Sequence, residues 1–251
     1  MGVELQLAVL HRMGAWVLPL ALATVSLSVG SGYAWGRLLG FSRKLSLLLA
    51  TGNSVCGSSA IAAMAPSINA EEEDVGLSIG AVNLLGTLGI VFIPFLAVSL
   101  GLNTLQSAIL TGGSLQAVGQ VAAAGFAMSA TIGKWALVVK MSRVLMIVPL
   151  VLVVPRLLHT QEPLGAQAGR KAFPVYIAGF VFFSILGTLA GPASALTVGL
   201  KTAGQGLMMV AMLAIGLNIR MDRILKAAPR ALVTVALSTM VQIGFLLLVI
   251  H

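Results

Sequence analysis

The stretch Thr51-Gly-Asn-Ser-Val-Cys-Gly-Ser-Ser-Ala-Ile-Ala-Ala63 decides the fold, because its glycines and hydroxyls interrupt an apolar segment long enough to cross a bilayer. A second interruption, Thr111-Gly-Gly-Ser114, lies 60 residues further on. Polar, glycine-rich backbone inside the hydrocarbon is costly unless it lines a cavity, and paired interruptions are typical of transporters that hold substrate near the midplane. The alternative is that these small residues only allow helices to pack closely.

The rest of the chain has the composition of a polytopic membrane protein. Of its 251 residues, 58% are hydrophobic and 9% are charged, and the mean hydropathy is +1.03. Water-soluble domains do not reach these values. About eight apolar segments have spanning length: residues 15–36, 45–68, 77–100, 104–128, 134–158, 172–190, 196–217 and 230–250. We therefore expect one all-α transmembrane domain over residues 1–251, with two of its spans formed by discontinuous helices.

Charged loops predict the orientation of this domain. The links at residues 37–44, 159–171 and 218–230 hold most of the Lys and Arg. If all eight segments cross, these links share one side, which the positive-inside rule makes cytoplasmic, and the acidic run 71–74 lies on the other. All the charged loops then agree with a single orientation. This agreement favours interrupted segments that cross the membrane over re-entrant ones. It also leaves residues 1–14 outside with no span before them, so we expect helices upstream of this sequence. The alternative is a short tail, with Glu4, His11 and Arg12, that is translocated unaided.

Two cations within segment 134–158 are the strongest functional signal. Lys140 and Arg143 would lie roughly 9 and 14 Å below the outer end of this helix, and their three-residue spacing puts both on one face. Charges at this depth mark functional sites by default, although a long side chain can also reach back to the interface. All seven Asp and Glu residues fall in loops or at segment ends. Backbone carbonyls, water or a bound anion must therefore balance the two cations, and an anionic substrate is the most economical of these.

Small and polar residues near the interruptions could complete an anion site. Half-helix N-termini are expected after Gly52 and Gly57, and helix N-termini bind sulfate-like groups through free N–H groups and the helix dipole. Polar residues in spans can equally bridge two helices, and this alternative applies to Asn83, Gln116, Gln120, Gln205 and Asn218. Gln116 and Gln120 are the better site candidates of these, because i, i+4 spacing puts them on one face next to the second interruption. The substrate-binding candidates are Gly52, Asn53, Ser54, Gly57, Ser58, Ser59, Gly112, Ser114, Gln116, Gln120, Lys140 and Arg143.

Other classes of function find little support in the sequence. The three histidines and the single cysteine, Cys56, form no metal-ligand or nucleophile–base pattern, so we expect no metal, no cofactor and no enzymatic activity. The net charge of +8 arises from topology-setting loops, so nucleic acid is not an expected partner. The expected partners are a small anion and membrane lipid. The sequence does not determine the oligomeric state.

The first interruption, followed by Pro66, resembles the G-x-S-I-C-G-x-S-A-I-A-A…P signature of the YeiH-like or UPF0324 membrane proteins, a family of proposed sulfate exporters. Three further pieces agree in order: Gln120-Val-Ala-Ala-Ala-Gly125, Val139-Lys-Met-Ser-Arg143 and Ala211-Met-Leu-Ala-Ile-Gly-Leu217. The resemblance runs from about residue 2 to the end. It implies a multi-pass inner (plasma) membrane transporter for an anionic sulfur compound.

Two departures from the family pattern limit what the resemblance implies. Family members are usually longer by several N-terminal helices, which agrees with the truncation expected above. They also commonly carry a His and an acidic residue where this chain has Gln116 and Ala117, so proton coupling by that pair does not transfer. We therefore expect a secondary transporter of a small anion. The alternative is a non-transporting membrane scaffold or degenerate paralogue.

Overall fold

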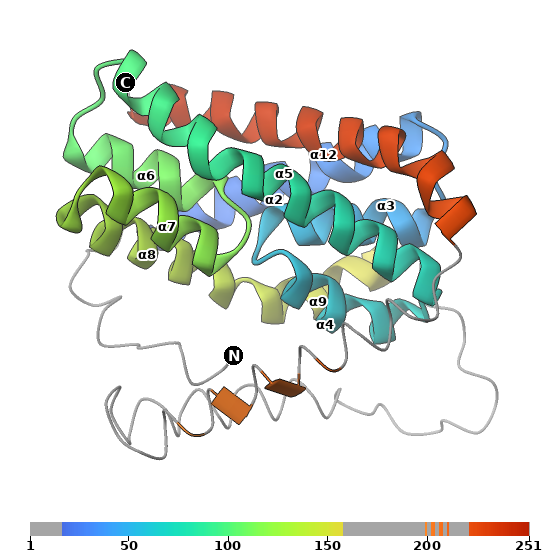
Figure 1. The fold of residues 1–251 in the computed structure, drawn as a ribbon. Helices are drawn as coiled ribbons and strands as arrows, with labels where there is room; N and C mark the ends of the chain where they lie inside the picture. Colours follow the sequence, from blue (N-terminus) through green and yellow to red (C-terminus); the bar gives the residue numbers. More distant parts are fainter. Residues whose placement is uncertain are drawn as a thin grey trace.

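Four long helical paths run the length of the molecule in the part that the structure describes. The computed structural model describes residues 17–157 and 221–250, with a few isolated helical positions between 199 and 210. Each long path is long and apolar enough to cross a membrane. They are α2 (Val17–Leu38), α5 (Glu72–Ser99), α8 (Ala130–Leu145) continued by α9 (Ile147–Leu157), and α12 (Met221–Ile250) (Figure 1). They correspond to four predicted segments, whereas segments 172–190 and 196–217 lie outside the continuously described residues.

The two interrupted segments form pairs of short helices instead of single discontinuous spans. The first pair is α3 (Arg43–Ser54) and α4 (Ser58–Met64), which ends in the 3-10 turn η2 (Ala65–Ile68). The second pair is α6 (Thr104–Ser114) and α7 (Val118–Met128). At about 1.5 Å per residue, α3 is roughly 18 Å long, about half of what a bilayer core and its interfaces require. We call residues 43–68 hairpin 1 and residues 104–128 hairpin 2.

Hairpin 1 returns to the end of the molecule from which it starts. Lys44, at the start of α3, donates a hydrogen bond from Nζ to the carbonyl oxygen of Asn69, just after η2, at 3.1 Å. A continuous helix over these residues would separate the two by more than 30 Å, because each residue advances about 1.5 Å. The segment is therefore re-entrant.

Hairpin 2 also turns back, at the opposite end. Gly112 of α6 and Gly125 of α7 both pack against Ala136 of α8: a Cβ built on Gly112 would lie 2.2 Å from the Ala136 carbonyl oxygen, and one on Gly125 would lie 3.5 Å from the Ala136 Cβ. In one straight helix these two glycines would lie roughly 20 Å apart. Thr104, which starts α6, lines the same groove as Met128, which ends α7. Figure 1 shows α3 and α4 toward one end of the molecule and α6 and α7 toward the other.

The expected crossing of both interrupted segments is therefore wrong, and so is the expected position of the acidic run. Arg230 at the start of α12 lies 5.7 Å from the centre of the Phe41 ring, and Lys44 contacts Asn69, so these residues share one end of the molecule. The acidic run begins at Glu71, directly after that contact, and supplies the first turn of α5. Acidic side chains there stabilise the N-terminus of α5 through the helix dipole. We call this end, with Arg37, Arg43, Lys44 and Arg230, the basic end.

Local sequence signals set where the hairpin arms begin. Ser42 caps α3 by accepting from the N–H of Leu45 at 3.1 Å. Asn103 and Gln106 form a reciprocal capping box at the start of α6, with both hydrogen bonds at 3.0 Å. Ser129 caps α8 and thereby ends hairpin 2. Such caps satisfy the free N–H groups of a first helical turn.

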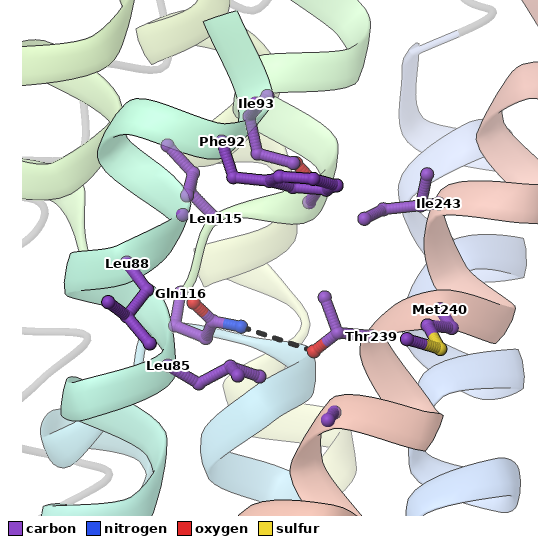
Figure 2. Close-up of a pocket in the computed structure, with 12 residues that line it drawn as sticks. Leu85, Leu88, Phe92, Ile93, Leu115, Gln116, Thr239, Met240 and Ile243 are labelled. Carbon is purple, nitrogen blue, oxygen red and sulfur yellow. Dashed lines mark hydrogen bonds between the residues drawn. The ribbon is translucent and has the colours of Figure 1, made fainter. Parts of the chain in front are cut away.

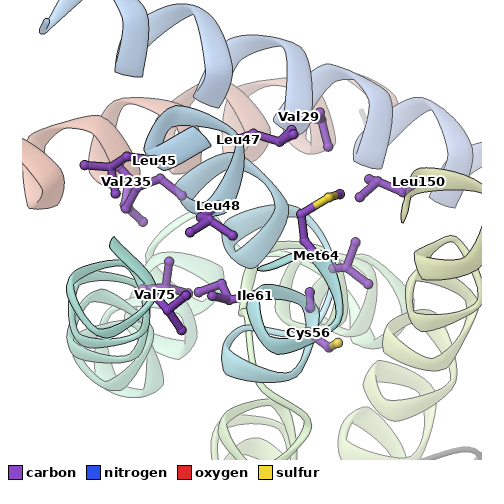
Figure 3. Close-up of a cluster of buried hydrophobic side chains, with 14 of the residues drawn as sticks. Val29, Leu45, Leu47, Leu48, Cys56, Ile61, Met64, Val75, Leu150 and Val235 are labelled. Carbon is purple, nitrogen blue, oxygen red and sulfur yellow. The ribbon is translucent and has the colours of Figure 1, made fainter. Parts of the chain in front are cut away.

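Each hairpin has its own apolar core among the long helices. In hairpin 1, buried side chains such as Leu48, Ile61 and Met64 pack with residues of α2, α5, α9 and α12 (Figure 3). In hairpin 2, Leu110, Leu115 and Val121 pack in a second cluster. These two cores hold the tips of the hairpins toward each other in the middle of the bundle.

Candidate functional site

The two hairpin tips, residues 55–57 and 115–117, meet inside the bundle. Gly57 has φ +70, and a Cβ built on it would lie 3.8 Å from the Cβ of Gln116 and 4.0 Å from that of Ala117. An L side chain rarely adopts this backbone conformation, so the first tip requires glycine. The contact joins breaks that are far apart in sequence into one central region.

Lys140 of α8 connects both tips. Its ammonium nitrogen donates to the carbonyl oxygens of Val55 and Leu115, the second at 2.8 Å. The side chain is fully buried. One cation thus holds the first residue of each tip.

Arg143, one helical turn further on, holds the last turns of α3 and α6. Its Nε donates to the carbonyl oxygen of Ser54 at 3.1 Å, and its Nη1 donates to that of Gly113 at 2.5 Å. Longer contacts reach the carbonyl oxygens of Asn53 and Gly112. Arg143 is only 1% exposed, so carbonyls from two hairpins replace its hydration shell.

These contacts have a simple electrostatic reason. The last carbonyls of a helix have no partner within that helix, and a helix C-terminus carries about −0.5 charge. The arms α3 and α6 end in the interior, where water does not satisfy those carbonyls. Of the three partners that the sequence left open for the two cations, the structure shows backbone carbonyls. Whether the cations also attract a substrate stays a prediction.

A buried network of amides and hydroxyls lies beside the tips. The Oδ1 atom of Asn53 accepts from Gln116 Nε2 at 2.8 Å and from Thr239 Oγ1 at 2.9 Å. The network continues through Ser28 of α2 and Gln242 of α12. Sequence reasoning missed the members from α2 and α12, which are Ser28, Ser238, Thr239 and Gln242. The available signal was a polar group in the middle of each of these two apolar segments.

Gln120 helps to form the second tip. Its Oε1 accepts from the N–H of Ala117 at 2.8 Å, which satisfies one free donor at the start of α7. Its Nε2 donates to the carbonyl oxygen of Asn83 at 3.4 Å. A Cβ built on Gly86 of α5 would lie 2.3 Å from Gln120 Oε1 and 2.6 Å from Gln116 Oε1. Both glutamines therefore lie directly over this glycine.

A cavity of about 140 Å³ extends from the second tip between α5 and α12 (Figure 2). Its polar lining comes from Ser114, Gln116 and Thr239, and the rest is apolar. Leu88, Phe92 and Met240 at its margin are more than half exposed, at 62%, 54% and 66%. Cavities of roughly this size hold a small organic molecule.

The predicted site residues are all near the tips, but several have positions that differ from the expectation. The two Thr-Gly-x-Ser motifs do not form the breaks; they are the last turns of α3 and α6, and the breaks follow directly. Gly52 is therefore not followed by a helix N-terminus. The hydroxyls of Ser54 and Ser114 donate back to carbonyls of their own helices, at 2.5 and 2.6 Å. Ser58 and Ser59 open α4 and are half-buried.

The chain is similar to membrane proteins of several bacteria. The family model described as Conserved hypothetical protein 698 matches residues 1–235. A UPF0324 membrane protein of Agrobacterium fabrum is 34% identical over 98% of this chain and 70% of its own length. The chain belongs to the UPF0324 membrane protein family. A second UPF0324 protein, of Lactiplantibacillus plantarum, is 31% identical over 99% of this chain and 77% of its own. No solved structure matches the chain.

Membership in the UPF0324 family agrees with the helical, multi-pass architecture and confirms the family resemblance seen in the sequence. The names of these relatives state a membrane protein and no substrate. Within residues 17–157 and 221–250, no three His, Cys, Asp or Glu side chains are placed together to hold a metal ion. The described side chains at the tips are two buried cations, neutral amides, hydroxyls and the thiol of Cys56.

Proposed function

We propose that this UPF0324 protein is a secondary transporter or exporter of a small anion, sulfate or a related sulfur-containing anion, and that the anion binds at the hairpin tips. The proposal places the protein in the inner (plasma) membrane with the basic end in the cytoplasm, because positive loops stay on the cytoplasmic side. The candidate substrate-binding residues are the tip residues and the two cations identified in the sequence.

The balance of charge at the tips carries this proposal. Two helix C-termini supply about −1 charge in total, whereas protonated Lys140 and Arg143 supply two positive charges. The N-terminus of α7 adds further partial positive charge at the second tip. The acidic residues 71–74 begin α5 at the basic end and do not balance this charge. An excess of roughly one positive charge in a low-dielectric interior favours binding of an anion.

The arrangement of the hairpins also suits transport. Each hairpin lies between the tips and one end of the molecule, so displacement of one hairpin would open the tip region to one side only. Secondary transporters commonly hold substrate near the midplane on broken helices and expose it alternately. In this arrangement the long helices form the frame and the hairpins are the moving parts.

The scaffold alternative has one observation in its favour. The polar hydrogens of Lys140 and Arg143 are directed at carbonyl oxygens, so the two cations have a complete structural task without any ligand. A scaffold needs only that task. A transporter needs the additional attraction of an anion, which binding measurements detect.

Exchange of labelled anions across proteoliposomes tests the proposal. We expect vesicles with the purified chain to exchange at least one of sulfate, sulfite, 2-hydroxyethanesulfonate or 1-propanesulfonate, and vesicles with heat-inactivated protein to exchange none. Lys140→Gln should weaken anion binding while Arg143 still holds the last turns of α3 and α6. Lys134→Gln, an exposed change on the same helix, is the matched control. If the folded chain neither binds nor exchanges any of these anions, the scaffold alternative replaces the transporter.

A further inference from the structure

The direction of the hydrogen bonds around Asn53 is fixed by backbone carbonyls. Gln242 donates through Nε2 to the carbonyl oxygen of Gly113, which can only accept, so Gln242 Oε1 must accept from Ser28 Oγ, at 3.1 Å. Ser238 Oγ donates its hydrogen to the carbonyl oxygen of Ser28, also at 3.1 Å. Both serine hydroxyls therefore present lone pairs to Asn53. The amide of Asn53 must face them with Nδ2, at 3.4 and 3.1 Å.

This direction continues to the second hairpin tip. With its nitrogen turned toward the serines, Asn53 presents Oδ1 to Gln116 and Thr239, and both of them donate to it. Gln116 can do so only through Nε2. Its Oε1 is therefore the last acceptor of the network, and no group of the described chain donates to it. The orientation of an amide is assigned from its partners, and here every partner but the last is fixed.

The unpartnered oxygen belongs to a residue that lines a cavity where a ligand would bind. Gln116 is 1% exposed and lines the 140 Å³ cavity beside the second tip (Figure 2). A buried acceptor without a donor is costly, and native proteins rarely leave one empty. Lys140 donates to the carbonyl oxygen of Leu115, the residue before Gln116. The positive charge of Lys140 therefore lies close to the side of the cavity that Gln116 lines. One site thus combines attraction for negative charge with a demand for a hydrogen-bond donor.

We infer that the preferred ligand is an anion that carries its own O–H or N–H group, and that this group donates to Gln116 Oε1. This inference rests on the proposed anion transport and specifies its substrate class. Hydroxy- and amino-sulfonates and singly protonated oxyanions meet both demands. Sulfate at neutral pH has no hydrogen to donate. The mostly apolar lining of the cavity favours an organic member of this class, because it can accept a short carbon chain.

Two sulfonates of nearly equal size and equal charge test the inference. 2-Hydroxyethanesulfonate carries a hydroxyl where 1-propanesulfonate carries a methyl group. We expect the purified full chain to bind the hydroxylated sulfonate about tenfold or more tightly, because the other leaves a buried acceptor unpaired. Isothermal calorimetry measures the ratio of the two dissociation constants.

Two variants show whether Gln116 causes that ratio. Gln116→Met keeps the length of the side chain but removes the acceptor, and should bring the ratio close to one. Thr239→Val removes a hydroxyl from the same cavity and leaves Gln116 Oε1 in place, so the ratio should persist even if both affinities fall. The ratio in the parent chain tests the preference for a donor, and the folded variants test its assignment to Gln116.

The possible outcomes separate this inference from the proposed function. Equal binding of both sulfonates by the parent chain overturns the donor inference and leaves anion binding intact, since water could then serve the oxygen. A parental ratio that is unchanged in folded Gln116→Met overturns the assignment to this residue. Failure of every anion to bind overturns both the inference and the transport proposal.

Discussion

Hairpins 1 and 2 share a construction but differ in the chemistry of their tips. Each first arm ends in a Thr-Gly-x-Ser turn, each break is short, and the same two cations hold both. The first tip turns through Gly57, whose φ is positive. The second turns without glycine, through extended backbone at Leu115 and Ala117.

The hydrogen bonds of the two tips differ as well. Both polar atoms of the Asn53 side chain in hairpin 1 have partners, whereas Gln116 in hairpin 2, which lines the cavity, keeps an unpartnered oxygen. Asn53 of hairpin 1 therefore passes the direction of the network on, and Gln116 of hairpin 2 ends it beside the cavity. Two similar motifs in one sequence do not imply two equivalent halves of a site.

The largest expected effect is on topology. In a Cys56→Ala background, Arg43→Cys and Glu71→Cys should react with a membrane-impermeant maleimide from the same side, because hairpin 1 returns to the basic end. Leu100→Cys, after the full length of α5, should react only from the other side. Labelling of Arg43→Cys and Leu100→Cys from one side, with Glu71→Cys labelled only from the other, would restore the crossing arrangement.

Removal of the shared cation should destabilise both hairpins. Arg143→Met leaves buried carbonyl oxygens of α3 and α6 without donors, so we expect a loss of about 3 kcal/mol or more in the free energy of unfolding. Denaturation in detergent, followed by circular dichroism, measures it. Lys134→Met on the exposed part of α8 is the control, and equal stability of the two variants would contradict the role of Arg143.

Alanine substitutions of Gly52 and Gly112, which occupy the same position in the two motifs, should lower the melting temperature by different amounts. A Cβ on Gly112 would meet the backbone of Ala136 at 2.2 Å, which cannot yield easily. A Cβ on Gly52 would meet the end of the Ile61 side chain at 2.6 Å, which can rotate. Gly112→Ala should therefore lower the melting temperature clearly more than Gly52→Ala.

Gly119→Ala provides the control for that pair, since nothing lies within 4 Å of the added Cβ. It should leave the melting temperature unchanged or slightly raised, because alanine favours helix over glycine. A larger loss in Gly52→Ala than in Gly112→Ala would show that hairpin 1, not hairpin 2, packs more tightly.

The smallest expected loss of stability comes from substitutions that change the backbone preference of the tip residues. Gly57→Ala forces an L residue into φ +70 and should cost about 1–2 kcal/mol of stability. Ala117→Gly, at an ordinary extended conformation, should cost only a few tenths of that. Comparable losses in the two variants would mean that the tips do not differ in backbone strain.

The sequence predicted the ingredients of the site better than their arrangement. The two interruptions, the buried cations and the four described long segments were found from apolar length and from charge in apolar surroundings. Re-entrance was not predicted, because a segment of 24 apolar residues has the same composition whether it crosses once or turns back. Contacts between distant residues separate the two cases, such as that of Lys44 with the carbonyl oxygen of Asn69 in hairpin 1.

The partners of the cations could not be predicted for a related reason. Arg143 binds backbone carbonyl oxygens, which every residue type carries. The identity of a residue therefore does not indicate that its carbonyl is a partner. The serines and Gln242 in α2 and α12 were visible as polar residues, but their meeting with Asn53 depends on which helices are neighbours. Such contacts follow from packing and not from local pattern.

The contact between Lys140 and Val55 has a consequence for biosynthesis. The carbonyl of Val55 leaves the ribosome 85 residues before the ammonium group that holds it. A tip without this partner would carry unsatisfied carbonyls into the lipid, which the hydrocarbon does not tolerate. We therefore expect the nascent hairpin 1 to stay at the water interface while α5, hairpin 2 and α8 are made, and to enter the bundle once α8 has crossed the membrane.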